Sequence, residues 1–196
     1  MKTDIFNSDK KYKIIYADPP WSYNSKMALG KGAKRSSAED YYKTMSTQDI
    51  CDLPIKDIAD NDCILFIWTT FPKLFETQKV INSWGFEYKT CAFVWVKKNK
   101  KYSEERNIKR GGIDDFMGQG RWTRQNAEIC LLATKGKPKR LSAKVRQIIY
   151  SEIREHSRKP DRVRNDIIEL VGDLPRIELF ARQVVEGWDC FGDEVD

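Results

Sequence analysis

The chain reads Ile14-Ile15-Tyr16-Ala17-Asp18-Pro19-Pro20-Trp21 at the point that decides its fold. The first four residues are apolar and two of them are β-branched, which predicts a short buried β-strand. The strand ends at Asp18, because neither proline can donate a hydrogen bond to a neighbouring strand and each restrains the residue before it. The strand therefore delivers a carboxylate, two prolyl carbonyls and an indole to the carboxyl end of a sheet, the edge where open α/β folds bind ligands.

The chemistry of this turn suits a planar substrate that carries an amine. Asp18 and the Pro19 carbonyl offer only hydrogen-bond acceptors, which is what an exocyclic NH2 group needs. Trp21 offers a flat face on which a nucleobase could stack, for roughly 1–3 kcal/mol. The alternative is an ordinary strand-to-turn corner in which Trp21 is a core aromatic residue, since Asp-Pro and Pro-Pro pairs are common turn formers.

The rest of the chain alternates expected strands and helices. Further strands are expected at 63–68, 91–96, 128–133, 147–150 and 177–180. Ser46-Thr47-Gln48-Asp49 is typical of a capping box and starts a short helix that Pro54 interrupts. A second helix opens at Pro72 and a third at Pro160, and Gly85 and Gly172 follow their ends. The apolar face of the second helix is expected to be Leu74, Phe75, Val80, Ile81 and Trp84. The alternation predicts one α/β domain over residues 1–196 with a mainly parallel sheet.

The net charge of +6 is unevenly distributed. Basic residues gather in three segments, about 22–42, 97–124 and 135–160, and each segment adjoins the end of an expected strand. Scattered lysines often serve solubility alone, but three such segments favour a polyanionic partner, and we expect nucleic acid.

Composition excludes several other classes of protein. No apolar run approaches the 18 residues of a membrane span and the first eleven residues are polar, so we expect no membrane segment, no secretory signal and a cytoplasmic location. The five cysteines are scattered and form no CxxC pair, which favours reduced core residues over disulfides or zinc ligands. With His156 as the single histidine, neither a Ser-His-Asp hydrolase nor a His-based metal site is expected.

Asp18-Pro19-Pro20-Trp21 resembles the signature of the adenine-N6 methyltransferases. That family includes the catalytic subunit of the eukaryotic mRNA adenosine methyltransferase and many bacterial and phage DNA enzymes. The resemblance continues in order through 65–69, 84–87, 94–97, 128–138, 157–161 and 176–182. It covers nearly the whole chain, from about Asp4 to Glu194.

The resemblance implies a Rossmann-like class I methyltransferase fold, with helices on both faces of the sheet and a permuted motif order. It implies S-adenosylmethionine as cofactor, and the absence of a GxGxxG after any expected strand removes support for a dinucleotide. Asp4 and Ile5 would hold the adenine ring, and Asp18 would face the methionine ammonium. Ser157 and Lys159 would face the carboxylate, just before a helix start that favours an anion. The residues implied on the ribose and adenine side are Glu178, Phe180, Arg182, Asp193 and Glu194.

The implied reaction is methyl transfer to the N6 amine of adenine. Asp18, Pro19, Pro20 and Trp21 would be the catalytic turn. The residues expected to hold the substrate are Trp21, Tyr42, Trp95, Arg121, Arg124 and Glu128. Two positions depart from the family pattern: Asp193 stands where an asparagine is expected, and Val184 stands where some relatives carry a polar residue.

The substrate is expected to be DNA, because relatives that methylate mRNA carry long extra regions outside the catalytic domain. The same chemistry on RNA and a non-catalytic nucleic-acid-binding subunit are the alternatives. A homodimer and a monomer both stay open.

Overall fold

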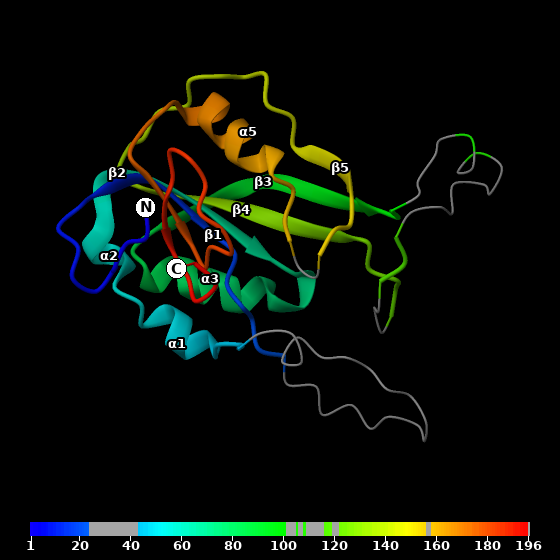
Figure 1. Cartoon of the computed structure of the whole chain (residues 1–196), viewed down its shortest axis with the longest axis horizontal. Coiled ribbons are helices and arrows are strands. Elements are labelled where there is room, and N and C mark those ends of the chain that lie inside the picture. The colour runs from blue at the N-terminus through cyan, green and yellow to red at the C-terminus, as the bar shows by residue number, and fades with distance from the viewer. Residues whose placement is uncertain are drawn as a thin grey trace.

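A computed structural model describes residues 1–23, 43–100, 105, 108, 116–118, 122–155 and 158–195. In these residues seven strands form one sheet in the order β5-β3-β4-β2-β1-β6-β7 (Figure 1). The strands are β1 Tyr12–Ala17, β2 Ala59–Thr69, β3 Glu87–Lys98, β4 Ala127–Lys135, β5 Ile148–Glu152, β6 Arg176–Leu179 and β7 Asp189–Phe191. β1 therefore lies inside the sheet, with β2 on one side and β6 on the other.

The sheet is mainly parallel, as predicted, with β4 as the exception. β1 runs parallel to β2 and β6, β6 to β7, and β3 to β5, whereas β4 is antiparallel to both of its neighbours, β2 and β3. In this register Thr69 at the end of β2 pairs with Ile129, and Cys63 pairs with Lys135. The start of β4 therefore reaches the same edge as Asp18, while its end lies at the opposite edge.

Helices cover both faces of the sheet, also as predicted (Figure 1). Alternate residues of β1 enter two different cores: Ile15 and Ala17 lie in one cluster, and Ile14 and Tyr16 in the other. The first cluster also holds buried residues of α1 Thr47–Cys51, α2 Ile55–Ile58 and α3 Leu74–Ser83. The second holds those of α5 Arg162–Val171. The period of two along a strand thus places one helix layer on each side.

The predicted capping box of α1 and the predicted glycine after α3 are confirmed, whereas α3 and α5 begin two residues later than predicted, at Leu74 and Arg162. Ser46 accepts from the Asp49 N–H and the Asp49 side chain accepts from the Ser46 N–H, which completes the capping box of α1. Gly85 follows α3 with φ +81°, a conformation that favours glycine. The expectation for Phe75 is wrong: its side chain is 80% exposed, because the first turn of α3 directs Leu74 and Thr77 to the core and leaves Phe75 on the outer face.

Two features at the carboxyl-terminal part of the chain differ from expectation. β6 ends at Leu179, so Phe180 is outside the strand and takes φ +60°, which is uncommon for a residue with a side chain. β7 was not anticipated, because three residues are too few to show an alternating pattern.

The structure divides the third basic segment between two edges of the sheet. Lys135 lies beside Cys63 at the start of β2, and the loop that follows contacts Asp62 and the end of α5 through Leu170. The first part of the loop 136–147 therefore lies at the edge opposite Asp18, and the chain returns to the level of the Asp18 edge only where it enters β5, whose Ile148 pairs with Val94. The expectation that all of 135–160 serves the site is wrong for this part. Most of 22–42 and much of 97–124 lie outside the described residues.

Within the described part of the chain, no helix has the length and apolar character needed to cross a membrane.

Candidate active site

The Asp-Pro-Pro-Trp turn is fixed by backbone hydrogen bonds at the carboxyl end of β1. The Trp21 N–H donates to the Pro19 carbonyl at 2.9 Å, and the Met45 N–H donates to the Pro20 carbonyl at 2.8 Å. The Asp18 N–H points to the Leu179 carbonyl of β6 at 3.5 Å. The turn is thus held between the end of β6 and the segment before α1, with the Asp18 side chain one-quarter exposed.

Asp18 is the end of a chain of four alternating charges. The Lys159 ammonium lies 2.8 Å from Asp18 Oδ2 and 3.1 Å from Glu128 Oε2. Glu128 also accepts a hydrogen bond from the Lys97 ammonium. The four groups come from the ends of β1 and β3, the start of β4 and the loop before α5. The antiparallel direction of β4 is what brings Glu128 to this edge.

The pKa values follow from burial and from these pairings. Burial opposes ionisation of Glu128, but the ammonium groups of Lys159 and Lys97 overcome it and lower its pKa to about 2. Burial also opposes the charge of Lys159, and Asp18 and Glu128 overcome it and raise its pKa. For Asp18 burial is the larger effect, so its pKa is raised although Lys159 opposes the shift.

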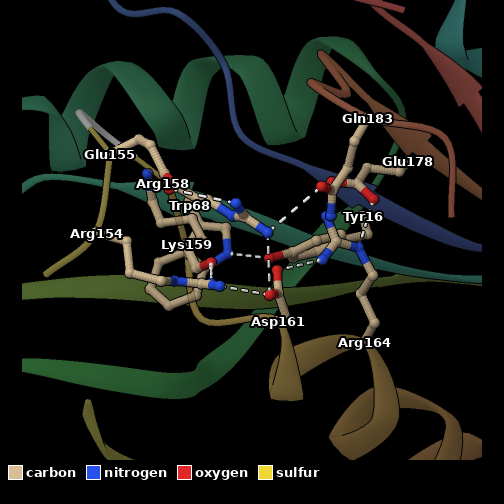
Figure 2. A network of polar contacts seen from close by, with 10 residues as sticks. All are labelled: Tyr16, Trp68, Arg154, Glu155, Arg158, Lys159, Asp161, Arg164, Glu178 and Gln183. Atoms are coloured by element: carbon tan, nitrogen blue, oxygen red, sulfur yellow. Dashed lines mark hydrogen bonds and ion pairs between the residues drawn. The ribbon is translucent and has the colours of Figure 1, made fainter. Parts of the chain in front are cut away.

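A second network joins α5 to the loops on either side of it (Figure 2). Arg164 forms a bidentate pair with Glu178, with both nitrogen–oxygen distances 2.7 Å. Asp161 accepts from three arginines, Arg154 at 2.5 Å and Arg158 and Arg164 at 3.2 Å each. Arg154 also donates to the Lys159 carbonyl at 2.9 Å, which holds the loop that carries the Lys159 side chain.

Two cavities meet at this edge of the sheet. The smaller one, of about 180 Å³, lies over the arginine network, and the larger one, of about 570 Å³, lies between the catalytic turn and the end of the chain. The residues that line both are Asp18, Phe180, Arg182 and Glu194. Asp18 therefore borders both cavities, of which the smaller is lined by charged residues and the larger is more apolar.

Backbone geometry at the chain end shapes the larger cavity. A Cβ on Gly192 would lie 2.3 Å from the Ala181 carbonyl oxygen, so only glycine fits here. The left-handed conformation of Phe180 turns its side chain out of the strand direction and into the lining of both cavities. Strained residues of this kind cluster at ligand sites.

The structure brings together most of the residues expected at the site. Asp18, Lys159, Glu178, Phe180, Arg182 and Glu194 line the smaller cavity, and Pro19, Pro20 and Asp193 line the larger one. Asp4 and Ile5 precede Phe6, which lines the larger cavity. The Asp4 side chain accepts a hydrogen bond from the Phe6 N–H, and Ile5 is buried. Arg124 is exposed before β4. Tyr42, Arg121, Ser157 and His156 lie outside the described residues.

The expectation of an open stacking face on Trp21 is not supported, and Trp95, which was expected to hold the substrate, is also buried. Trp21 is 5% exposed and its indole N–H donates to the Trp68 carbonyl at 3.2 Å. Trp95 is 2% exposed and its N–H donates to the Ser151 carbonyl. Trp21 follows β1 and Trp95 lies within β3, and both rings pack in the core because helices cover the faces of the sheet. For Trp21 this is the alternative of a core aromatic residue.

Lys159 and Glu178, which were expected to face the cofactor, each pair with charged side chains of the protein. Lys159 pairs with Asp18 and Glu128, and Glu178 pairs with Arg164. Sequence reasoning missed the partners Lys97, Arg154, Arg158, Asp161 and Arg164. The clustering of arginines around Asp161 was visible, but nothing in the sequence indicated which charges meet.

Among the described residues, no group of three His, Cys, Asp or Glu side chains is arranged to hold a metal ion.

A mainly parallel α/β sheet with an Asp-Pro-Pro-Trp turn at the carboxyl end of an inner strand defines a Rossmann-like methyltransferase. The chain belongs to the MT-A70 family, whose signature matches residues 12–194. It is 38% identical over 200 residues to the Type II methyltransferase M.MunI of Mycoplasma sp, covering 95% of this chain and 78% of that protein.

More distant relatives are adenosine methyltransferases. The chain is 28% identical over 189 residues to the N(6)-adenosine-methyltransferase catalytic subunit METTL3 of Homo sapiens, covering 95% of this chain but only 28% of that protein. The MT-A70-like N(6)-adenosine-methyltransferase of Drosophila melanogaster is likewise 28% identical, with 27% of its length covered. The match to these proteins is therefore confined to one part of each.

Proposed function

We propose that this chain transfers a methyl group from S-adenosylmethionine to the exocyclic N6 amine of adenine in DNA. The observation that carries the proposal is the position of Asp18: an acceptor carboxylate at the carboxyl end of β1 that lines both cavities. Family membership supports methyl transfer, and the site supports an amine as the group that receives the methyl.

The residues around the two cavities fit the cofactor. The charged smaller cavity suits a zwitterionic amino acid, with carboxylates for an ammonium and guanidinium groups for a carboxylate. In the larger cavity, the rings of Phe6, Phe180 and Phe191 suit a purine, and the carboxylates of Asp193 and Glu194 suit ribose hydroxyls. When bound, the cofactor supplies a methyl group activated by a sulfonium.

The catalytic turn would act on the amine that accepts this methyl. The N6 lone pair of adenine is delocalised into the ring, and acceptors on its two N–H groups favour a more pyramidal, more nucleophilic nitrogen. Asp18 supplies one acceptor. The Pro19 carbonyl supplies the second, since its bond from the Trp21 N–H at 2.9 Å uses only one of its two lone pairs. Holding the nitrogen in line with the methyl group is the main contribution, and the excess proton leaves after transfer.

Two points favour DNA over RNA. The resemblance at the catalytic turn extends to bacterial and phage DNA enzymes, and M.MunI matches at higher identity and over most of its length. The adenosine methyltransferases match over a much smaller share of theirs. We further propose a cytoplasmic protein that forms a homodimer, an oligomeric state that light scattering would test.

Transfer of labelled methyl to matched DNA and RNA oligonucleotides tests the proposed function. We expect N6-methyladenine in DNA, identified by mass spectrometry. Product in RNA alone would keep the mechanism and correct the substrate. No product, with no measurable cofactor binding, would favour a non-catalytic nucleic-acid-binding subunit.

The logarithm of the binding constant for nucleic acid should fall linearly with the logarithm of salt concentration, because lysines and arginines that bind the phosphates release counterions from them. Arg124 is exposed before β4 at the edge that carries Asp18, so Arg124→Gln should lower the magnitude of the salt slope by about one. Arg140→Gln is the matched control, since Arg140 is exposed in the loop 136–147 at the other edge. Fluorescence anisotropy with a short duplex measures the salt slope of each variant. Equal slopes for the two variants would contradict the binding of nucleic acid at the edge that carries Asp18.

A further inference from the structure

The smaller cavity contains four cations that could bind the carboxylate of an amino acid, and the structure distinguishes them. Arg158, Lys159, Arg164 and Arg182 all line this cavity. Which of them binds the carboxylate depends on which is least committed to carboxylates of the protein itself. This question rests on the proposed function, because it concerns the amino-acid end of S-adenosylmethionine.

Three of the four cations are engaged at short range. Lys159 is 9% exposed and lies between Asp18 at 2.8 Å and Glu128 at 3.1 Å. Arg164 holds both oxygens of Glu178 at 2.7 Å. Nε of Arg182 lies 3.0 and 3.1 Å from the two oxygens of Glu194. Binding a new anion at Lys159 or Arg164 would require a close ion pair to be weakened, and Arg182 already contacts both oxygens of a carboxylate.

Arg158 is the least committed cation of the lining. Its contacts are longer, 3.3 Å to Glu155, 3.2 Å to Asp161 and 3.4 Å to the Gln183 side-chain oxygen. Glu155 is 68% exposed, and Asp161 is shared with two other arginines. Figure 2 shows the Arg158 guanidinium reaching toward Gln183 and Asp161. A guanidinium fork in this position can accept a carboxylate with little loss of existing contacts.

We propose that Arg158, with the side-chain amide of Gln183 beside it, binds the α-carboxylate of the cofactor, in the role that the resemblance assigned to Ser157 and Lys159. Lys159 then serves the turn by neutralising Asp18 and Glu128. Arg154 is a positioning residue, because it donates to the Lys159 carbonyl at 2.9 Å and to Asp161 from below the same loop. The site therefore recognises a nucleoside that carries a zwitterionic amino acid.

Binding of three related probes by isothermal titration calorimetry tests this assignment. S-adenosylhomocysteine carries the ammonium and the carboxylate, its decarboxylated analogue carries only the ammonium, and 5′-methylthioadenosine carries neither. Arg158→Gln should weaken S-adenosylhomocysteine at least about tenfold, as expected for loss of a charge-assisted hydrogen bond, and change the other two less than about twofold. Arg140→Gln is the matched control, because Arg140 is exposed in the loop 136–147 and does not line this cavity.

The probes separate the possible failures. Equal weakening of all three ligands by Arg158→Gln would mean a structural role and would overturn the assignment, as would unchanged affinity for S-adenosylhomocysteine. If the wild-type protein binds none of the three, the cofactor assignment itself fails and the role of Arg158 fails with it. Selective loss of S-adenosylhomocysteine, with the decarboxylated analogue retained, also shows that the variant is folded.

Discussion

Asp18→Asn should lower kcat/KM for methyl transfer by about 10²–10³-fold, the usual effect of removing one preorganised polar group from a reacting centre. The asparagine keeps the size of the side chain, but its amide nitrogen adds donors where the N6 amine needs acceptors. The rate is measured with labelled methyl from S-adenosylmethionine, and N6-methyladenine is identified by mass spectrometry.

The same substitution should leave the melting temperature unchanged or raised at pH 7. Burial raises the pKa of Asp18 in the folded protein, so ionised Asp18 opposes folding above its usual pKa. Removing that charge should therefore leave the free energy of unfolding unchanged or raise it, as expected for a residue that serves activity and not stability. Asp9→Asn, at an exposed position, is the control for both measurements. Turnover at the wild-type rate by a folded Asp18→Asn protein would refute the mechanism.

The strand that carries Asp18 and the helix starts were predictable because each depends on neighbours in sequence. An apolar run before Asp-Pro-Pro could only be a buried strand that stops there. The capping box at Ser46 and the glycine after α3 act through bonds and dihedral angles within a single turn. Local chemistry therefore decides these elements, and the structure agrees with them.

The direction of β4 and the partners of its charges depend on contacts between distant segments. Nothing near Glu128 in the sequence indicates that its strand runs against its neighbours, although this direction is what places it beside Lys159. The positive charge of Lys159 was predictable, but its pairing with Asp18 joins residues 141 positions apart. The role of Trp21 was equally hard to predict from sequence. An indole is suited to stacking on a base, but in the structure the surrounding elements bury it.

Lys159→Met should destabilise the protein by about 3–5 kcal/mol at pH 7, because it leaves Asp18 and Glu128 in a buried site without the ammonium between them. For a chain of this length the melting temperature should fall by roughly 10 °C. Lys137→Met is the matched control, since Lys137 is exposed in the loop 136–147 and its loss should change the free energy of unfolding by less than about 0.5 kcal/mol.

The loss of stability caused by Lys159→Met should be smaller in acid than at pH 7. In the wild type, Lys159 and Lys97 lower the pKa of Glu128 from its usual 4.5 to about 2, so this pairing stabilises the protein above pH 4.5 and the stabilisation is lost as the pH falls toward 2. In Lys159→Met one of the two ammonium groups is gone, the pKa of Glu128 rises, and protonation relieves the uncompensated charge at higher pH. Thermal unfolding at pH 7 and pH 4 should therefore show a smaller difference from wild type at pH 4.

Adding Glu128→Gln to Lys159→Met should restore part of the lost stability at pH 7, because the double variant removes one of the two buried carboxylates together with their shared cation. The Glu128→Gln single variant should itself be destabilised, since it leaves Lys97 and Lys159 facing an uncharged amide. A double variant no more stable than Lys159→Met, with the same loss of stability at both pH values, would mean that Lys159 stabilises the fold through its contact with the Trp68 ring and not by pairing with the two carboxylates.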